Sequence, residues 1–309
     1  MEQKIIKDFI FDEEKAGDII SLLTQYSNLG FQSTLLTRAI EIIRSMKEDN
    51  ECTKFLTFTA NMVASGLRGV FVELVKRGYV DIIITTGGSI DHDIIRCYKS
   101  YLLGSFEEND VELHREGVNR IGNILVPNDR YEFLEKWVRD KLNKIYEGGE
   151  KVLSPSELIM RFAEEIENKN SILYWCKKKN IPIYCPGITD SAIGLQLYFF
   201  QQEHPDFMID VVSDLSKLIS KTLISTTTGA IILGGGISKH HTIGVNILRG
   251  GLDYSVYITT ASPYDGSLSG APPREAKSWG KISENAKTVT VHGDVTLILP
   301  LIFAGLEAL

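Results

Sequence analysis

The chain has 309 residues, of which 24% are charged and 43% hydrophobic, and 33 Lys and Arg against 40 Asp and Glu give a formal net charge of −7. The apolar content excludes a wholly disordered chain. The longest apolar run, at 297–306, is too short to span a bilayer and contains Pro300. The amino end has no signal-peptide core, so we expect a cytoplasmic protein. The acidic balance argues against nonspecific binding of nucleic acid.

The first ~50 residues should be helical and could pack across a subunit interface. After them, six β-branched runs each end in small or polar residues, at 54–59, 80–86, 181–185, 230–233, 254–259 and 287–291. Because these runs lack strict apolar–polar alternation, they are typical of strands buried on both faces. Apolar spacings of three and four predict helices at 62–76, 156–168 and 210–222. The segment 295–309 is a less regular helix, since it is apolar almost all round and contains Pro300.

This alternation predicts an α/β fold with a doubly wound, mainly parallel, Rossmann-like sheet and flanking helices. We expect one domain spanning 1–309, with the polar stretch 129–154 as a surface excursion. The ligand crevice of such a sheet lies beyond the carboxyl ends of the strands, where the small and polar residues fall. The four cysteines form no CxxC pair, so we expect reduced, mostly buried thiols, with a catalytic cysteine as a minor alternative.

Two glycine loops follow predicted strands, one at 234–236 and one at 85–89. Such loops let backbone amides approach a phosphate or a flat cofactor closely. Neither loop matches a standard nucleotide fingerprint, so a tight structural turn stays an equal alternative for each one. His240 and Asp91, with their histidine and aspartate neighbours, offer a metal site as a second alternative, although a lone histidine near a pocket more often binds or carries a proton.

The segment 265–281 contains three glycines and two adjacent prolines and is typical of a long, functional loop. It ends in Lys281, two residues after Trp279. A lysine that is poorly hydrated against an indole loses its charge more easily and can then form a Schiff base. Taken alone, Lys281 is better explained as a solvated surface lysine, and Asp265 and Glu275 are either ligands of an ammonium group or solvated loop charges.

Several motifs, in order from about 28 to 301, resemble those of the deoxyhypusine synthase family. The most specific is E-A-K-S-W-G-K-I at 275–282, which matches the family signature E-A-x-S-W-G-K-I. The others are D-G-S-L-S-G-A at 265–271, L-G-G-G-I-S-K-H-H at 233–241, R-I-G-N-I-L-V-P-N at 120–128, Thr189-Asp190 and G-F-Q-S-T at 30–34.

The resemblance implies an NAD-dependent transferase that moves the aminobutyl group of spermidine to a lysine of translation initiation factor 5A, through an imine on an enzyme lysine. It also implies a homotetramer with sites between paired subunits. Lys281 would be the nucleophile, and His240 would contact the substrate and help move a proton. The substrate would be bound by Asp91, His92, Asp265, Gly266, Ser267, Glu275 and Trp279. NAD would be bound by Asn61, Met62, Val63, Ala64, Thr86, Gly87, Gly88, Asp190, Gly234, Gly235, Thr260, Ala261, Asp294 and Val295, and no metal is implied.

The chain departs from the eukaryotic pattern at three carboxylates. It has Asp91-His92 in place of two glutamates, Leu195 in place of an aspartate, and Leu268 in place of the aspartate of G-S-D. Loss of an anion that holds a buried ammonium is costly, so the donor could bind differently or be another amine, such as agmatine. A homospermidine synthase with the same imine chemistry, a metal-dependent hydrolase and a non-catalytic NAD-binding paralogue are the alternatives.

Overall fold

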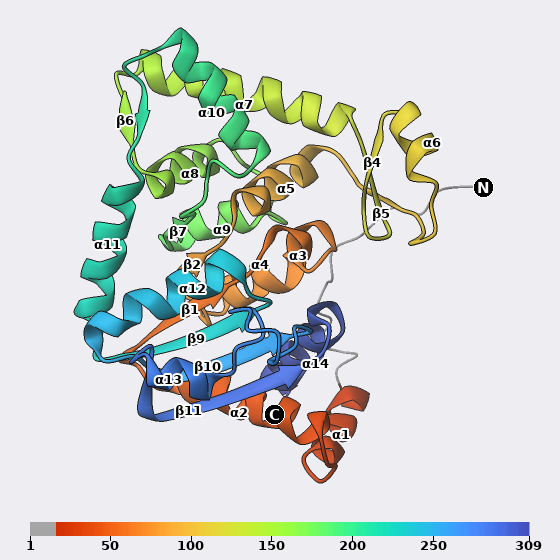
Figure 1. Ribbon diagram of the computed structural model, residues 1–309, viewed down its shortest axis with the longest axis vertical. Coiled ribbons are helices and arrows are strands. Elements are labelled where there is room, and N and C mark those ends of the chain that lie inside the picture. The colour runs from red at the N-terminus through yellow and green to blue at the C-terminus, as the bar shows by residue number, and fades with distance from the viewer. Residues whose placement is uncertain (1–16, 309) are drawn as a thin grey trace.

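The computed structural model describes residues 17–308, and its centre is a six-stranded, all-parallel sheet with the order β11-β10-β9-β1-β2-β7 (Figure 1). Its strands, in chain order, are β1 (Cys52–Thr57), β2 (Ile82–Ile84), β7 (Ile183–Tyr184), β9 (Thr227–Leu233), β10 (Leu252–Thr259) and β11 (Ile282–His292). Each overlaps one of the six predicted runs, and their order is that of a doubly wound sheet whose direction of winding reverses between β1 and β9. The predicted fold class is therefore confirmed.

The two faces of the sheet are covered by separate hydrophobic cores. Alternate residues such as Phe55 and Ile232 pack beneath α11 (Val211–Leu223), α12 (Gly236–Val245) and α13 (Pro273–Ser278). Their neighbours Leu56 and Ile231 face the larger core on the opposite side. That core is covered by α1 (Gly17–Tyr26), α2 (Gln32–Glu48), α4 (Arg68–Lys76), α5 (Gly87–Tyr98), α9 (Ile172–Lys179) and α14 (Val295–Ala308). Burial on both faces explains why central strands such as β2 and β9 lack polar alternation, whereas the edge strand β11 is buried only at some positions.

The predicted helices are present, with one change. The predicted helix 62–76 is two helices, α3 (Ala60–Ala64) and α4, because Gly66 has a φ of 111° that a continuous helix cannot contain. The other three correspond to α8 (Pro155–Glu164), α11 and α14, which keeps Pro300 inside it. The expected helical amino end is α1 and α2 within the described residues, and the rest of that prediction lies outside them.

The remaining elements form two excursions from the sheet. The first is an antiparallel meander of β3 (Leu102–Leu103), β4 (Val118–Ile121) and β5 (Ile124–Pro127), accompanied by α6 (Asp110–Arg115). The second contains α7 (Asp129–Glu147), α10 (Ala192–Glu203) and the short pair β6 (Val152–Leu153) and β8 (Met208–Ile209). Outside these excursions, the turn η2 (Asn246–Arg249) precedes β10. Figure 1 shows α7 and α10 side by side, far from α1 and α2. No helix of residues 17–308 has the length and apolar character needed to cross a membrane.

Candidate active site

The loops at the carboxyl ends of the strands touch one another, and their glycines make this possible. A Cβ on Gly88 would lie 2.9 Å from the Cβ of Ala60, so the loops after β1 and β2 are in contact. A Cβ on Gly87 would lie 2.5 Å from the Cβ of Ser191, which joins the loop after β2 to that after β7. These positions cannot hold a larger residue without moving a neighbouring loop. The structure thus brings together the segments 60–64, 86–88 and 190.

The loops on the other side of the winding reversal, after β9, β10 and β11, also contact neighbouring segments. A Cβ on Gly234 would meet the Cε of Met62 at 3.1 Å, and the amide of Gly236 donates to the Ser269 hydroxyl at 3.0 Å. At the far strands, the amide of Gly293 donates to the carbonyl of Thr259 at 3.0 Å. The predicted cofactor residues 234–235, 260–261 and 294–295 therefore share one edge of the sheet with those after β1 and β2.

Two helices begin at this edge, so the positive ends of their dipoles lie there. α5 begins at Gly87 and α12 at Gly236, each directly after a strand of the sheet. Unpaired amides and the positive end of the dipole make a helix start suitable for phosphate groups. Glycine loops that admit close approach, next to two such starts, fit the pyrophosphate of a dinucleotide such as NAD. The same glycines are needed for contacts between the loops, so the ligand-loop interpretation stays a prediction.

Lys281 lies beside a small cavity that contains further predicted site residues. Its amide donates to the Ala276 carbonyl at 3.0 Å and its carbonyl accepts from Leu252 at 3.1 Å, so α13 and β10 fix its backbone. Its Nζ lies 5.2 Å from the centre of the Trp279 ring. The cavity has a volume of about 30 Å³ and is lined by Lys239, Ile243, Tyr257, Leu268, Ala271, Glu275, Ala276, Trp279 and Lys281. The predicted contact between lysine and indole is present.

Lys239 is a site residue that sequence analysis did not single out. Its side chain is 1% exposed, and its Nζ donates to the Ala271 carbonyl at 2.8 Å and the Ser269 carbonyl at 3.3 Å. The Nζ also lies 4.4 Å from the ring centre of Tyr257, whose buried hydroxyl has no hydrogen-bond partner among the described residues. Burial lowers the pKa of Lys239 to about 8. Its spacing of four from Ile243 on α12 places both on the face toward Lys281.

His240 is the next residue of α12, but it is exposed and does not line the cavity of its own chain. Asp265, Gly266 and Ser267 are also exposed and form a turn in which Asp265 accepts from the Ser267 amide at 2.8 Å. The structure therefore assembles Lys281, Trp279 and Glu275, and leaves His240 and the 265–267 turn on the surface around them.

Asp91 and His92 are buried in α5 and have partners within the chain. The carboxylate of Asp91 accepts from the amides of Ala192 and Ile193 at 2.8 and 3.0 Å, and burial raises its pKa to about 6. His92 Nδ1 lies 2.7 Å from the Tyr101 hydroxyl, and burial lowers its pKa to about 4. In this chain both side chains hold elements of the fold together, with Asp91 capping α10.

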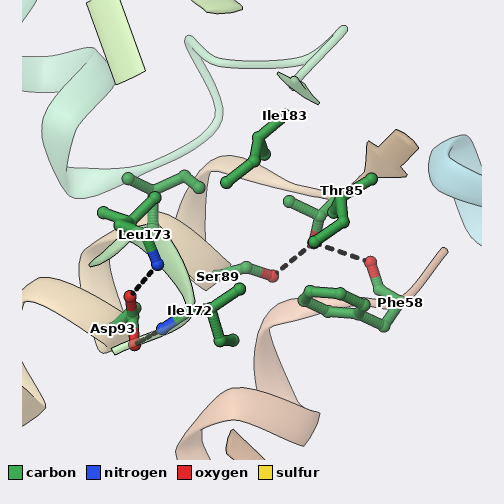
Figure 2. Close-up of a pocket in the computed structure, with 9 residues that line it drawn as sticks. Phe58, Thr85, Ser89, Asp93, Ile172, Leu173 and Ile183 are labelled. Carbon is green, nitrogen blue, oxygen red and sulfur yellow. Dashed lines mark hydrogen bonds between the residues drawn. The ribbon is translucent and has the colours of Figure 1, made fainter. Parts of the chain in front are cut away.

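Asp93 has a comparable structural role, as Figure 2 shows. It accepts from the amides of Ile172 and Leu173 at 3.2 and 3.0 Å and so caps α9, next to a cavity of only about 10 Å³. The Thr85 hydroxyl donates to the Phe58 carbonyl at 2.8 Å, which ties the end of β2 to that of β1 (Figure 2). A cavity of this size holds at most one water, so it is a packing feature beneath the site.

The part of the chain that the structure describes contains neither a metal-binding cluster nor an activated cysteine. Between residues 17 and 308, no group of three or more His, Cys, Asp or Glu side chains is placed to hold a metal ion. All four cysteines are free, and three of them are buried. Burial raises the pKa of Cys52, Cys97 and Cys185 to about 12, which disfavours the nucleophilic thiolate.

Known proteins share the sequence and the fold of this chain. The family model for deoxyhypusine synthase matches residues 21–306. The chain is 47% identical over 295 residues to the probable deoxyhypusine synthase of Thermoplasma acidophilum, covering 94% of this chain and 93% of that protein. It is 45% identical to the probable deoxyhypusine synthase of Thermococcus onnurineus, covering 91% and 88%. A crystal structure assigned as a deoxyhypusine synthase from Entamoeba histolytica superposes with a TM-score of 0.67 at 28% identity, covering 97% of both chains. The chain belongs to the deoxyhypusine synthase family.

Proposed function

We propose that this enzyme transfers the aminobutyl group of spermidine to one lysine of the translation initiation factor 5A precursor, with NAD as cofactor. The observation that carries the proposal is the placement of Lys281 beside Trp279 and Glu275 at a cavity whose far wall is Lys239. When bound, NAD would accept a hydride from the carbon next to the secondary amine and later return it. The glycine loops after β2 and β9, together with the loop after β1, would hold it.

Lys281 would act as the nucleophile on the oxidised substrate. Its free amine adds to the imine carbon, and the bond from that carbon to the departing nitrogen breaks. The two protons that the Lys281 amine loses pass to that nitrogen, and 1,3-diaminopropane leaves as a primary amine. The aminobutyl group is then held as an imine on Lys281 Nζ until the lysine of the factor displaces it by the same exchange. The exposed carboxylate of Glu275 is suited to the cationic end of the substrate, and the Trp279 ring to excluding water from the imine.

A second subunit would complete the site. A cavity of about 30 Å³ is the volume of one water molecule, so a polyamine must lie over its mouth and be covered from outside. Trp279, 67% exposed, lines that cavity, whereas the exposed His240 does not line it on the same chain. We propose the homotetramer implied by the resemblance, in which a partner covers Lys281 and contributes His240.

The first test uses spermidine labelled in its aminobutyl part, NAD and the purified factor. We expect label on the factor with the wild-type enzyme and none with Lys281→Ala, because the covalent carrier is lost, while NAD binding persists. Lys277→Ala, four residues earlier, is the matched control and should keep at least half of the rate. Label that appears in free homospermidine and not on the factor would contradict the protein acceptor.

The donor can be identified in the same system. Borohydride added during turnover should reduce the imine and leave a stable adduct on the peptide that contains Lys281. An aminobutyl mass with spermidine supports the proposed donor. A guanidinobutyl adduct formed only with agmatine would instead identify the alternative amine, which the apolar wall at Leu268 leaves open.

A further inference from the structure

The backbone is strained at Phe31, the residue before α2, although the Phe31 side chain is not buried. Phe31 has φ 58° and ψ −132°, and it is one of two non-glycine residues with positive φ in the described chain. Such a conformation costs about 1–3 kcal/mol and persists where the surroundings impose it. The Phe31 ring is 94% exposed, so packing of this ring does not account for the strain.

Gln32, the first residue of α2, makes a contact across 260 positions of the sequence. Its Oε1 accepts from the amide of His292, the last residue of β11, at 2.7 Å. Because β11 is the edge strand of the sheet, no further strand is available to that amide. Thr34 stabilises the turn from within, since its hydroxyl contacts the carbonyls of Leu29 and Phe31 at 2.9 and 3.1 Å.

The amide that Gln32 holds begins the turn at 292–295, which leads into α14. On its other side this turn is fixed by Gly293, whose amide donates to Thr259. It is then closed by Asp294, whose Oδ1 accepts from the Thr296 amide at 2.7 Å. The resemblance to the family assigns Asp294 and Val295 to NAD binding. The turn is thus held from β10 on one side and from α2 on the other.

We propose that Gln32 is a positioning residue for the dinucleotide site, acting through the 292–295 turn. The inference rests on the proposed function and goes beyond it, because Gln32 itself is assigned no contact with the cofactor. The strained conformation at Phe31 is the means by which the chain enters α2 with the Gln32 side chain directed at His292. The function of the segment 30–34 is therefore to connect α2 to the cofactor edge of the sheet.

The test is NAD binding by calorimetry on the full chain. Gln32→Met keeps the length of the side chain but removes the acceptor, so the dissociation constant for NAD should rise roughly fivefold, as expected for one net hydrogen bond. Gln32→Glu keeps an acceptor and should stay within twofold of wild type. Gln25→Met, at an exposed glutamine of α1, is the matched control and should leave the constant unchanged.

Unchanged NAD affinity in Gln32→Met, even with a lower melting temperature, would show a merely structural role and overturn the inference. The inference is equally overturned if Gln32→Glu binds NAD as poorly as Gln32→Met. If the wild-type chain binds no NAD, the proposed function fails and the inference with it, so the two failures are distinguished by the wild-type titration.

Discussion

At the scale of single residues, the site combines two lysines with opposite surroundings. Lys281 lies beside an exposed indole at the cavity mouth, whereas Lys239 is buried at its inner wall among backbone carbonyls. The Lys239 ammonium connects α12 to the loop at 269–271 by its hydrogen bonds to two carbonyls. Ala271 of this loop lines the Lys281 cavity. Its charge is expensive to bury, and a lowered pKa is the result.

This burial predicts a specific pH dependence of stability. The folded chain releases the Lys239 proton near pH 8, whereas the unfolded chain holds it up to the ordinary lysine value of 10.5. Between these values the unfolded state binds more protons, so the contribution of Lys239 to stability rises with pH. Between pH 8 and 10.5, we expect the free energy of unfolding of wild type to rise relative to that of Lys239→Met. Urea unfolding at several pH values measures this, with Lys277→Met as control, and parallel profiles would contradict it.

At the scale of elements, sequence patterns predicted the sheet well because each strand is a β-branched run closed by small residues. They failed where tertiary context decides. The break between α3 and α4 depends on the backbone of Gly66. The strands of the meander are short, and β3 and β4 are only partly buried. Lys239 could not be identified because its partners lie 30 and 32 residues away, on a loop placed by β10 and α13. The glycine loops were identified, but their mutual contacts required the structure.

The contact between the 234–236 loop and the 265–271 loop leads to a prediction about activity. A Cβ on Gly235 would lie 2.5 Å from the Cα of Ser269, so Gly235→Ala must displace the 265–271 loop. Small displacements of positioning groups can cost about 10²-fold in rate, and we expect a loss of that order in aminobutyl transfer. Gly244→Ala, in the same helix with open space around it, should keep full activity and gain up to about 1 kcal/mol of stability. Transfer rates and unfolding midpoints of both variants test this, and equal rates would contradict the loop contact.

At the scale of the whole molecule, one chain presents an incomplete site. The strand-end loops proposed to hold NAD touch one another within the chain, but Lys281 is only half-buried at a cavity too small for a polyamine, and His240 does not line that cavity. An enzyme that must keep an imine dry needs the cavity mouth covered. A second copy is the simplest cover, because a two-fold pair would bring the same surface of each subunit against the other and complete two equivalent sites.

Shared sites predict that two inactive variants restore each other. If each site takes Lys281 from one subunit and His240 from its partner, a hybrid of Lys281→Ala and His240→Ala contains one doubly altered site and one intact site. Random pairing makes half of the pairs hybrids, so co-expression should restore roughly a quarter of the wild-type transfer rate. If both residues of a site belong to one chain, every site keeps one defect and co-expression restores nothing. Measuring transfer by each variant alone and by the co-expressed mixture separates these arrangements, and no gain in the mixture would rule out the shared site.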